Sequence, residues 1–421
     1  MSKSFSEDPM FQQALAFAKS PVTRRTVLAG AGATSIAAFL AACAKPGGSN
    51  TKTLTPATDV SATEKVVTWD NWPYYIDGES DQSFPTIKAF EAQTGIKVTY
   101  NINVDDNNSY FARVKNQLMA GKDTGADTMC LTDWMIARLI DNGYVQALDY
   151  TNIPNGLPTA NLDPAFDGAA GHFGDFDPGR KFSLPWKGII AAIGYHKVNY
   201  KKLTGKDAPT SVADLWAPEL KGKVEVLSEM RDTLGIMMMA DGIDIAKFTS
   251  DDFYNTLDKL KAQVVGKQIR NVKGNSYIDD FNDAGDAVAG IIWAGDLIGK
   301  NIEVGNDNLG VVLLDSGSTF ACDNFVIPMG SPHAANAEKI MNYYFEPAVA
   351  AKLALAGVNY VPPVKGTKEL VISQNPSLGN NELMFPSADT YQNKLHNFRP
   401  LTPKEDKEFS TAWSDVISGV A

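Results

Sequence analysis

A large ring and a carboxylate stand close together at the end of an apolar run. The run includes Ile292 and leads into Trp293, and Gly295 and Asp296 follow at once. Such a pair suits an organic cation, because the carboxylate attracts the charge while the indole face covers the methylene groups. The same residues are equally consistent with a core tryptophan followed by a solvated aspartate.

Similar residues recur at the ends of other predicted strands. Trp72 follows an apolar run at 65–69, and Trp134 follows another at 126–131. Asp323 lies at the edge of an apolar strand at 320–328, where an unpaired charge would be costly. Ligands of open α/β sheets bind outside the carboxyl ends of the strands. We therefore expect these side chains to belong to a binding site.

Glu229 and Asp232 follow a predicted strand at 223–227. If the chain turns helical there, the two carboxylates lie on one face of the helix. A helix N-terminus favours acidic residues through its dipole, and this explanation accounts for the pair equally well.

The sequence gives catalysis little support. The four histidines are scattered, without an H-x-x-x-H pair or a Ser/His/Asp pattern. Beyond Cys43, the only cysteines are Cys130 and Cys322, which form neither a disulfide framework nor a metal-ligand spacing. A single bridge between them after export stays open. We expect no enzyme activity, no metal and no cofactor.

The N-terminus has the pattern of an export signal. Arg24 and Arg25 precede an alanine-rich run, which is typical of twin-arginine signals. This run is too short and too small-sided for a stable transmembrane helix. It ends in Leu-Ala-Ala-Cys at 40–43, which resembles the lipobox of bacterial lipoproteins. We predict a signal peptide at 1–42, lipidation of Cys43, and a location on the membrane facing the periplasm or cell exterior.

A flexible tether is predicted for residues 43–64, which are rich in Gly, Pro, Ser and Thr from 44 onward. Cleavage before Cys43 would remove four basic and two acidic residues, so the net charge would change from −11 to −13. This acidic balance argues against a nucleic-acid partner and favours cationic ligands. The remaining length suggests two domains.

The mature chain begins with alternating strands and helices. Predicted strands at 65–69, 96–100 and 126–131 are separated by helical patterns at 85–93 and 110–120. This β-α-β-α-β order predicts an α/β fold with a parallel sheet covered by helices. A long apolar passage at 182–195 is interpreted as the chain crossing into a second lobe.

Several short motifs, taken in order, resemble one protein family from about Lys65 to the C-terminus. They are Asn71-Trp72-x-x-Tyr75, Phe90-Glu91-x-x-Thr94-Gly95-Ile96-Lys97-Val98, Thr210-Ser211-x-Ala213-Asp214-Leu215-Trp216-x-Pro218-Glu219, Glu229-x-Arg231-Asp232, Trp293-Ala294-Gly295-Asp296, Asp323 before Phe325-Val326-Ile327-Pro328, and Phe385-Pro386-x-Ala388. In this order they resemble the extracellular solute-binding proteins of ABC importers, specifically the putrescine/spermidine-binding branch.

The resemblance implies a two-lobed periplasmic-binding-protein-like fold of type II, with a mostly parallel, helix-covered sheet in each lobe and a hinged cleft between them. Lobe 1 is expected to contain 65–185 with 310–364, and lobe 2 to contain 186–309 with 365–421. The implied protein is a monomeric receptor that captures a linear polyamine and delivers it to ABC permease subunits.

The family's ligand-binding roles transfer position by position. The implied ligand-binding residues are Trp72, Tyr75, Thr132, Glu229, Asp232, Trp293, Asp296 and Asp323. The aromatic residues among them would stack on the ligand, and the carboxylates would hold its ammonium groups. Whether putrescine, spermidine or another diamine is preferred stays open.

Two departures from the family pattern leave other solutes open. Pro73 and Tyr74 occupy positions where the family often has polar residues, and Lys187 falls near the expected cleft. Lys187 or Arg231 would suit an amino acid or opine-like zwitterion, whereas Tyr74 with Tyr75 would suit ferric iron. A hydrolase on the same scaffold is a further alternative, although no nucleophile with a base is evident.

Overall fold

The computed structural model describes residues 54–167 and 176–420. The predicted export signal at Arg24 and Arg25 and the lipidation site at Cys43 lie outside these residues. One compact unit of the chain contains residues 51–401 and 412–421, and the other contains, among the described residues, 402–411. None of the helices in the described ranges is long and apolar enough to cross a membrane.

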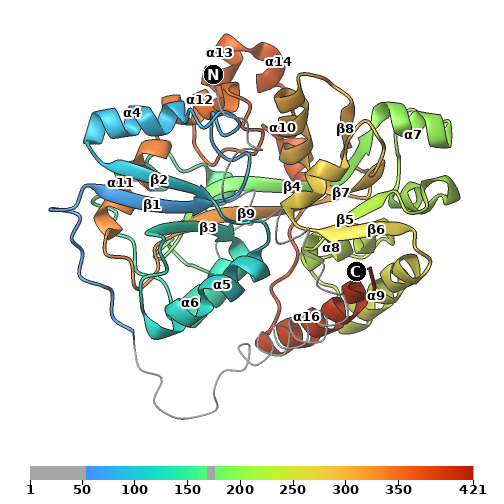
Figure 1. The fold of residues 1–421 in the computed structure, drawn as a ribbon, viewed down its shortest axis with the longest axis horizontal. Coiled ribbons are helices and arrows are strands. Elements are labelled where there is room, and N and C mark those ends of the chain that lie inside the picture. The colour runs from blue at the N-terminus through green and yellow to red at the C-terminus, as the bar shows by residue number, and fades with distance from the viewer. Residues whose placement is uncertain (1–53, 168–175, 421) are drawn as a thin grey trace, which may run out of the picture. The chain divides into compact units, whose positions relative to one another are not determined.

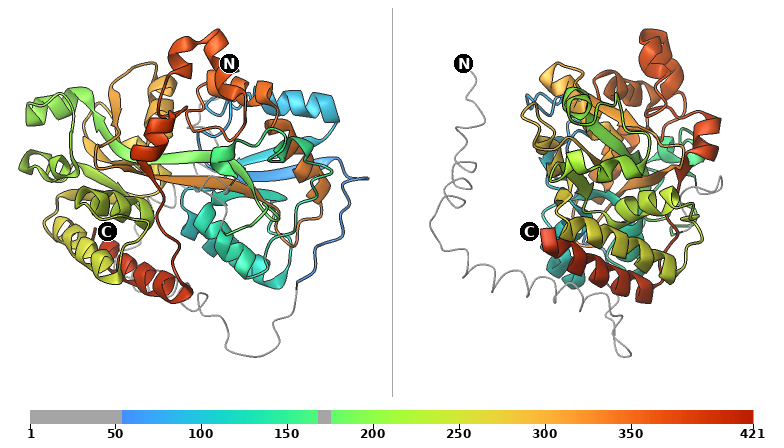
Figure 2. Two further views of the ribbon diagram at one scale, coloured as in Figure 1. Left: turned by 180° about the vertical axis from the view of Figure 1, so that it is seen from behind. Right: turned by 90° about the vertical axis from the view of Figure 1, so that its right-hand side faces the viewer.

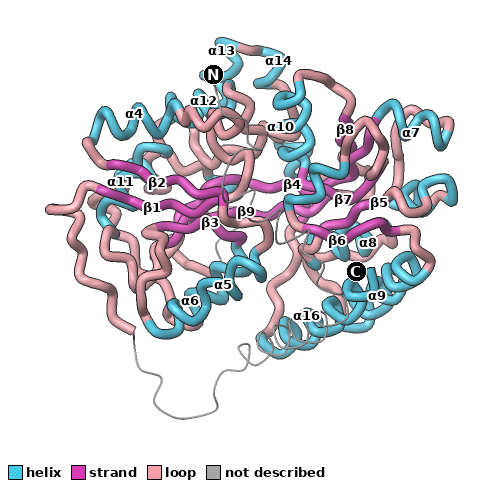
Figure 3. The backbone as a smooth tube through the Cα atoms, viewed as in Figure 1, coloured by secondary structure: helices cyan, strands magenta, loops and turns pink. Residues whose placement is uncertain are grey.

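Ten strands of the described residues form one mixed sheet in the order β2-β1-β3-β9-β4-β7-β5-β6, with β10 beside β9 and β8 beside β4 (Figure 3). The strands are β1 (Val66–Asn71), β2 (Lys97–Ile102), β3 (Thr128–Thr132), β4 (Leu184–His196), β5 (Val224–Leu227), β6 (Ile269–Lys273), β7 (Ala289–Trp293), β8 (Leu309–Val312), β9 (Ser318–Val326) and β10 (Leu395–His396). The helices are α4 (Pro85–Thr94), α5 (Asn107–Ala120), α6 (Asp133–Asp141), α7 (Lys197–Thr204), α8 (Met230–Ala240), α9 (Ser250–Val265), α10 (Ala294–Val304), α11 (Ala334–Tyr344), α12 (Pro347–Leu355), α13 (Thr367–Gln374), α14 (Pro376–Gly379), α15 (Ala388–Asn393) and α16 (Pro403–Ile417).

The first lobe is built on β1, β2 and β3, which are parallel as expected. Successive side chains of β1 point to opposite faces of the sheet. Helices cover both faces of this part of the sheet (Figure 1). The Trp69 ring lies 5.4 Å from the ring of Tyr344 in α11. The next side chain, Asp70, accepts a hydrogen bond from Tyr110 of α5 at 2.9 Å. Helices α11 and α5 therefore cover opposite faces of the first-lobe sheet.

The second lobe is built on β5, β6 and β7, which are also parallel, with β4 antiparallel to β7. Helices α8 and α9 lie on one side of this sheet and α10 on the other (Figure 1). The mostly apolar helix α8 buries Leu234 and Met238, and α10 buries Leu297. The two-lobed α/β fold predicted from the sequence is confirmed.

Strands β4 and β9 run from one lobe into the other (Figures 1 and 2). Every residue of β4 is buried, as its long apolar sequence predicts. The strand continues through Pro185, where the register of its pairing with β9 shifts. A shift of this kind accommodates a proline, which cannot donate a ladder hydrogen bond.

The chain passes from the second lobe back to the first within β9, as the partners of this strand show. Thr319 is paired with Ala191 of β4, whereas Asp323 is paired with Thr132 of β3. We expected the residues from 310 onward to belong to lobe 1. Strand β8, which contains the first of them, pairs with the second-lobe end of β4. The sequence could not place this crossing, because β8 and β9 are both apolar along their length.

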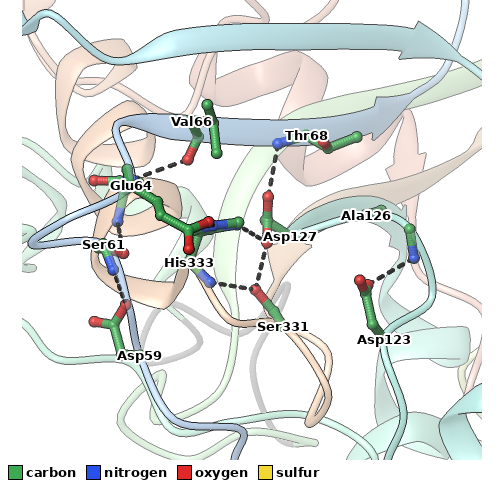
Figure 4. Close-up of polar contacts among 12 residues, drawn as sticks. Asp59, Ser61, Glu64, Val66, Thr68, Asp123, Ala126, Asp127, Ser331 and His333 are labelled. Atoms are coloured by element: carbon green, nitrogen blue, oxygen red, sulfur yellow. Dashed lines mark hydrogen bonds and ion pairs between the residues drawn. The ribbon is translucent and has the colours of Figure 1, made fainter.

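Part of the predicted tether packs against the protein. Ala57 N–H donates to the Met329 carbonyl at 2.8 Å. Further on, His333 lies between Glu64 at 3.1 Å and Asp127 at 3.0 Å (Figure 4). The predicted tether is therefore not free of the protein over its whole length, because Ala57 and Glu64 are held by these contacts. The sequence did not reveal them, because the partners lie far along the chain.

Candidate functional site

The predicted ligand residues come from strand ends of both lobes. Trp72 follows β1, and Thr132 ends β3 in the first lobe. In the second lobe, Glu229 and Asp232 follow β5, and Trp293 ends β7. Carboxyl ends of parallel strands are the positions where α/β sheets bind ligands. The structure thus brings the rings and carboxylates to the sheet edge where a ligand is expected.

Asp323 is the buried carboxylate of the first lobe, with 2% of its surface exposed. It accepts hydrogen bonds from the Tyr75 hydroxyl at 2.5 Å and the Thr132 hydroxyl at 2.7 Å. Thr132 is itself fixed by the Asn107 side-chain amide at 2.8 Å. Burial raises the pKa of Asp323 to about 7, although these hydrogen bonds favour its ionised form.

Asp296 is the buried carboxylate of the second lobe, in the first turn of α10. It accepts hydrogen bonds from the Tyr277 hydroxyl and the Asn275 side-chain amide, both at 2.8 Å, and from the Tyr360 hydroxyl. Burial raises the pKa of Asp296 to about 7. Its hydrogen-bond donors are neutral hydroxyl and amide groups, so none of them compensates the charge of an ionised carboxylate.

Two further carboxylates lie at the start of α8. Asp232 accepts from the Trp293 indole N–H at 2.8 Å and from the Thr319 hydroxyl at 2.5 Å, and burial raises its pKa. Glu229 caps α8 by accepting from the Arg231 N–H at 3.1 Å, and the Arg231 guanidinium lies 3.4 Å from it. Burial raises the pKa of Glu229 to about 7, and the charge of Asp232 adds to this effect.

Aromatic rings connect the two lobes around these carboxylates. The Trp72 and Trp293 rings meet edge to face, with centroids 5.8 Å apart and planes at 74°. The Tyr75 and Tyr360 rings lie 4.4 Å apart, and their hydroxyls donate to Asp323 and Asp296 respectively. All eight predicted ligand residues therefore lie in or beside one buried cluster.

The residues that suggested other ligands have different surroundings. The Tyr74 hydroxyl donates to Glu303 at 2.7 Å, whereas the Tyr75 hydroxyl donates to Asp323, so these two phenols do not converge on one position. In residues 54–167 and 176–420, no group of three or more His, Cys, Asp or Glu side chains is placed to hold a metal. The ferric-iron alternative therefore receives no support from the geometry.

Lys187 is buried and lies opposite Asp323 in the pairing of β4 with β9. Its ammonium is 4.2 Å from the Trp186 ring centroid. Burial lowers the pKa of Lys187 to about 7, and the charges that oppose this shift belong to Cys130 and Asp77 of the first lobe. Arg231, the other cation that we considered, stacks 4.0 Å over the Trp134 ring and pairs with Glu229.

Four residues of the cluster were not predicted from the sequence: Asn107, Asn275, Tyr277 and Tyr360. They hold Thr132 and Asp296 through the hydrogen bonds described above. No local pattern marks them, because each reaches its partner through the fold. The two cysteines whose pairing stayed open, Cys130 and Cys322, are buried free thiols.

The chain is similar to known bacterial proteins along most of its length. The profile of the bacterial extracellular solute-binding protein family matches residues 85–380. The chain is 28% identical over 374 residues to the putrescine-binding periplasmic protein PotF of Escherichia coli, covering 86% of this chain and 93% of that protein. It is 27% identical over 369 residues to the spermidine/putrescine-binding periplasmic protein 1 of Haemophilus influenzae, covering 86% and 91%.

The fold is also similar to that of solved structures. The substrate-binding protein PotD of a spermidine/putrescine ABC transporter from Streptococcus pneumoniae superposes with a TM-score of 0.65 at 23% identity, covering 85% of this chain and all of that one. Family profile, relatives and fold agree with the motifs identified in the sequence. The chain therefore belongs to the bacterial extracellular solute-binding protein family and is a binding protein, not an enzyme.

Proposed function

We propose that this protein is an exported, lipid-anchored receptor that captures a linear polyamine, putrescine or spermidine, and delivers it to the permease of an ABC importer. The names of the E. coli and H. influenzae relatives support this class of ligand. The lipid anchor rests on Cys43 and its lipobox, and the export route rests on Arg24 and Arg25.

The observation that carries the proposal is the pair of buried carboxylates, Asp296 and Asp323. They come from different lobes and are held by neutral donors. Ionised carboxylates in a buried site need a positive partner. A ligand with an ammonium at each end supplies one charge to each lobe, and charge-assisted hydrogen bonds of this kind contribute roughly 1.5–3 kcal/mol each.

The aromatic residues suit the part of the ligand between its charges. Trp72, Tyr75 and Trp293 are all buried in the cluster. Their faces would cover the methylene groups, each of which contributes about 0.8 kcal/mol when buried. Of the two further carboxylates, Asp232 is the better partner for an additional ammonium, because Glu229 already faces the Arg231 guanidinium.

A zwitterionic ligand is the second candidate, and one observation favours it. The Trp72 indole N–H is buried and has no hydrogen-bond partner among the described residues. A ligand carboxylate would accept from this donor, whereas an ammonium would not. A water molecule bound beside a polyamine would satisfy it as well, so this observation carries less weight than the two carboxylates.

A thermal-shift screen of the purified protein separates these candidates. Putrescine, spermidine, amino acids, a sugar and Fe³⁺ are each added in excess. A ligand at about 100 times its dissociation constant should stabilise the protein by about 2.7 kcal/mol. Stabilisation by the polyamines alone supports the proposal, and stabilisation by an amino acid without any response to polyamines contradicts it.

A further inference from the structure

A second contact between the lobes lies beside the ligand cluster and combines backbone and side-chain hydrogen bonds. Asp105 and Asp106 follow β2 in the first lobe, and residues 274–276 follow β6 in the second. The N–H groups of Asn275 and Ser276 donate to the carbonyl and carboxylate of Asp105 at 3.1 and 2.9 Å. The Ser228 hydroxyl donates to the Asp106 carboxylate at 2.7 Å. These bonds exist only when the lobes are together.

Gly274 shows how closely the lobes approach at this contact. A Cβ atom added to Gly274 would lie 2.1 Å from the Asp105 carbonyl oxygen, far inside van der Waals contact. The φ angle of Gly274 is −73°, outside the left-handed region that favours glycine. The close approach of the other lobe therefore explains the glycine at this position.

Asn275 connects this contact to the ligand cluster. Its backbone N–H donates to Asp105 of the first lobe, while its side-chain amide donates to Asp296 at 2.8 Å. The charge of Asp105 also acts on Asp296, since it adds to the rise in the pKa of that carboxyl. One residue thus contacts both the opposite lobe and the carboxylate expected to hold an ammonium.

We propose that Asp105 and residues 274–276 form a latch that holds the closed state, with Asn275 as the positioning residue that couples the latch to Asp296. The role of Asp296 in this proposal rests on the proposed function. A ligand shifts a conformational equilibrium only through its greater affinity for one state. Contacts that exist only in the closed state therefore increase the apparent affinity of the ligand.

The first test is Gly274→Ala, which introduces a clash only when the lobes are closed. We expect the thermal stability of the ligand-free protein to be unchanged. The affinity for putrescine should fall at least tenfold, mainly through faster dissociation, and small-angle scattering should show less compaction on adding putrescine. Gly419→Ala is the matched control, because its added Cβ would lie at an ordinary 3.4 Å from Val264. Native affinity and native compaction in Gly274→Ala overturn the latch.

The second test separates the coupling from the latch. Asn275→Ala removes the amide that donates to Asp296 but keeps the N–H that donates to Asp105. The variant should still compact at saturating putrescine, although with weaker affinity, and Asn275→Gln should restore part of that affinity. Loss of compaction in Asn275→Ala contradicts the assigned coupling role.

The latch and the ligand assignment fail in different ways. If putrescine does not bind the native protein, the proposed function is wrong. The latch is then tested with whichever solute stabilises the native protein in the thermal-shift screen, and Gly274→Ala should weaken the binding of that solute and reduce the compaction that it causes. Native affinity and native compaction with that solute overturn the latch.

Discussion

The indole rings of Trp72 and Trp293 meet edge to face, 5.8 Å apart, although one follows β1 of the first lobe and the other ends β7 of the second. The Trp293 N–H also donates to Asp232 at 2.8 Å. The two rings therefore form part of the contact between the lobes.

Removal of either ring should weaken polyamine binding. Trp72→Ala and Trp293→Ala should each cost about 1–2 kcal/mol, because cation–π and methylene contacts are lost in a desolvated site. Titration calorimetry with putrescine measures the effect. Trp293→Phe keeps a ring but removes the bond to Asp232, so it separates stacking from hydrogen bonding. Native affinity in both alanine variants would mean that these rings only pack the core.

Binding should depend on pH because the site carboxylates hold protons. The pKa values of Asp296 and Asp323 are raised to about 7, from 3.8 for an ordinary aspartate. Between these values the folded, ligand-free protein holds protons that the unfolded chain has released, so these groups lower its stability as pH rises toward 7. A bound dication favours the ionised carboxylates, and its binding therefore releases protons.

The affinity for putrescine should accordingly increase with pH up to about 7. Below this value it should fall by up to about tenfold per pH unit for each carboxyl that must ionise. Calorimetry at pH 6 in two buffers of different ionisation enthalpy counts the protons released. The same apparent binding enthalpy in both buffers would contradict the assignment of protonated carboxyls to the ligand site.

Replacement of Lys187 distinguishes a cationic ligand from an anionic one. Lys187→Met removes a buried amine whose pKa is about 7 and keeps a side chain of similar length. Diamine binding should be unchanged or stronger, because a like charge is lost. The melting temperature of the variant serves as the control for folding. Loss of binding by a variant that still folds would indicate that the ligand carries an anionic group.

The export prediction concerns residues outside the described ranges. Replacement of Arg24 and Arg25 by lysine should block export, because twin-arginine signals depend on this pair. Cys43→Ala should prevent labelling by radioactive fatty acid and release the protein from the membrane fraction. Unchanged export of the lysine variant would exclude the twin-arginine route, and a labelled Cys43→Ala chain would exclude the lipoprotein assignment.

The sequence predicted the elements of the fold well because their patterns are local. The strands that end at Thr132 and Trp293 are apolar runs, and glycines such as Gly95 and Gly121 end the helices before and after β2. The crossing inside β9 could not be predicted, because pairing of Asp323 with Thr132 depends on strands far apart in the sequence.

Some residues of the candidate site could be identified from local motifs, and others could not. Its carboxylates and rings stand in recognisable motifs, and the structure brings them together. The hydrogen-bond donors Tyr277 and Tyr360 stand in no such motif, since they reach Asp296 only after folding. The contact of Gly274 with Asp105 could not be foreseen either, because it joins residues of two lobes that lie far apart in the sequence.

The central claim is that Asp296 and Asp323 each hold one ammonium group, and calorimetry on Asp296→Asn and Asp323→Asn tests it most directly. Either change leaves one buried ammonium without its partner, which typically costs about 3–5 kcal/mol, or roughly two to three decades in Kd. Both variants should keep their fold while losing putrescine binding to this extent, and a monoamine of equal length should bind the native protein far more weakly than putrescine. Native affinity for putrescine in both variants would contradict the account.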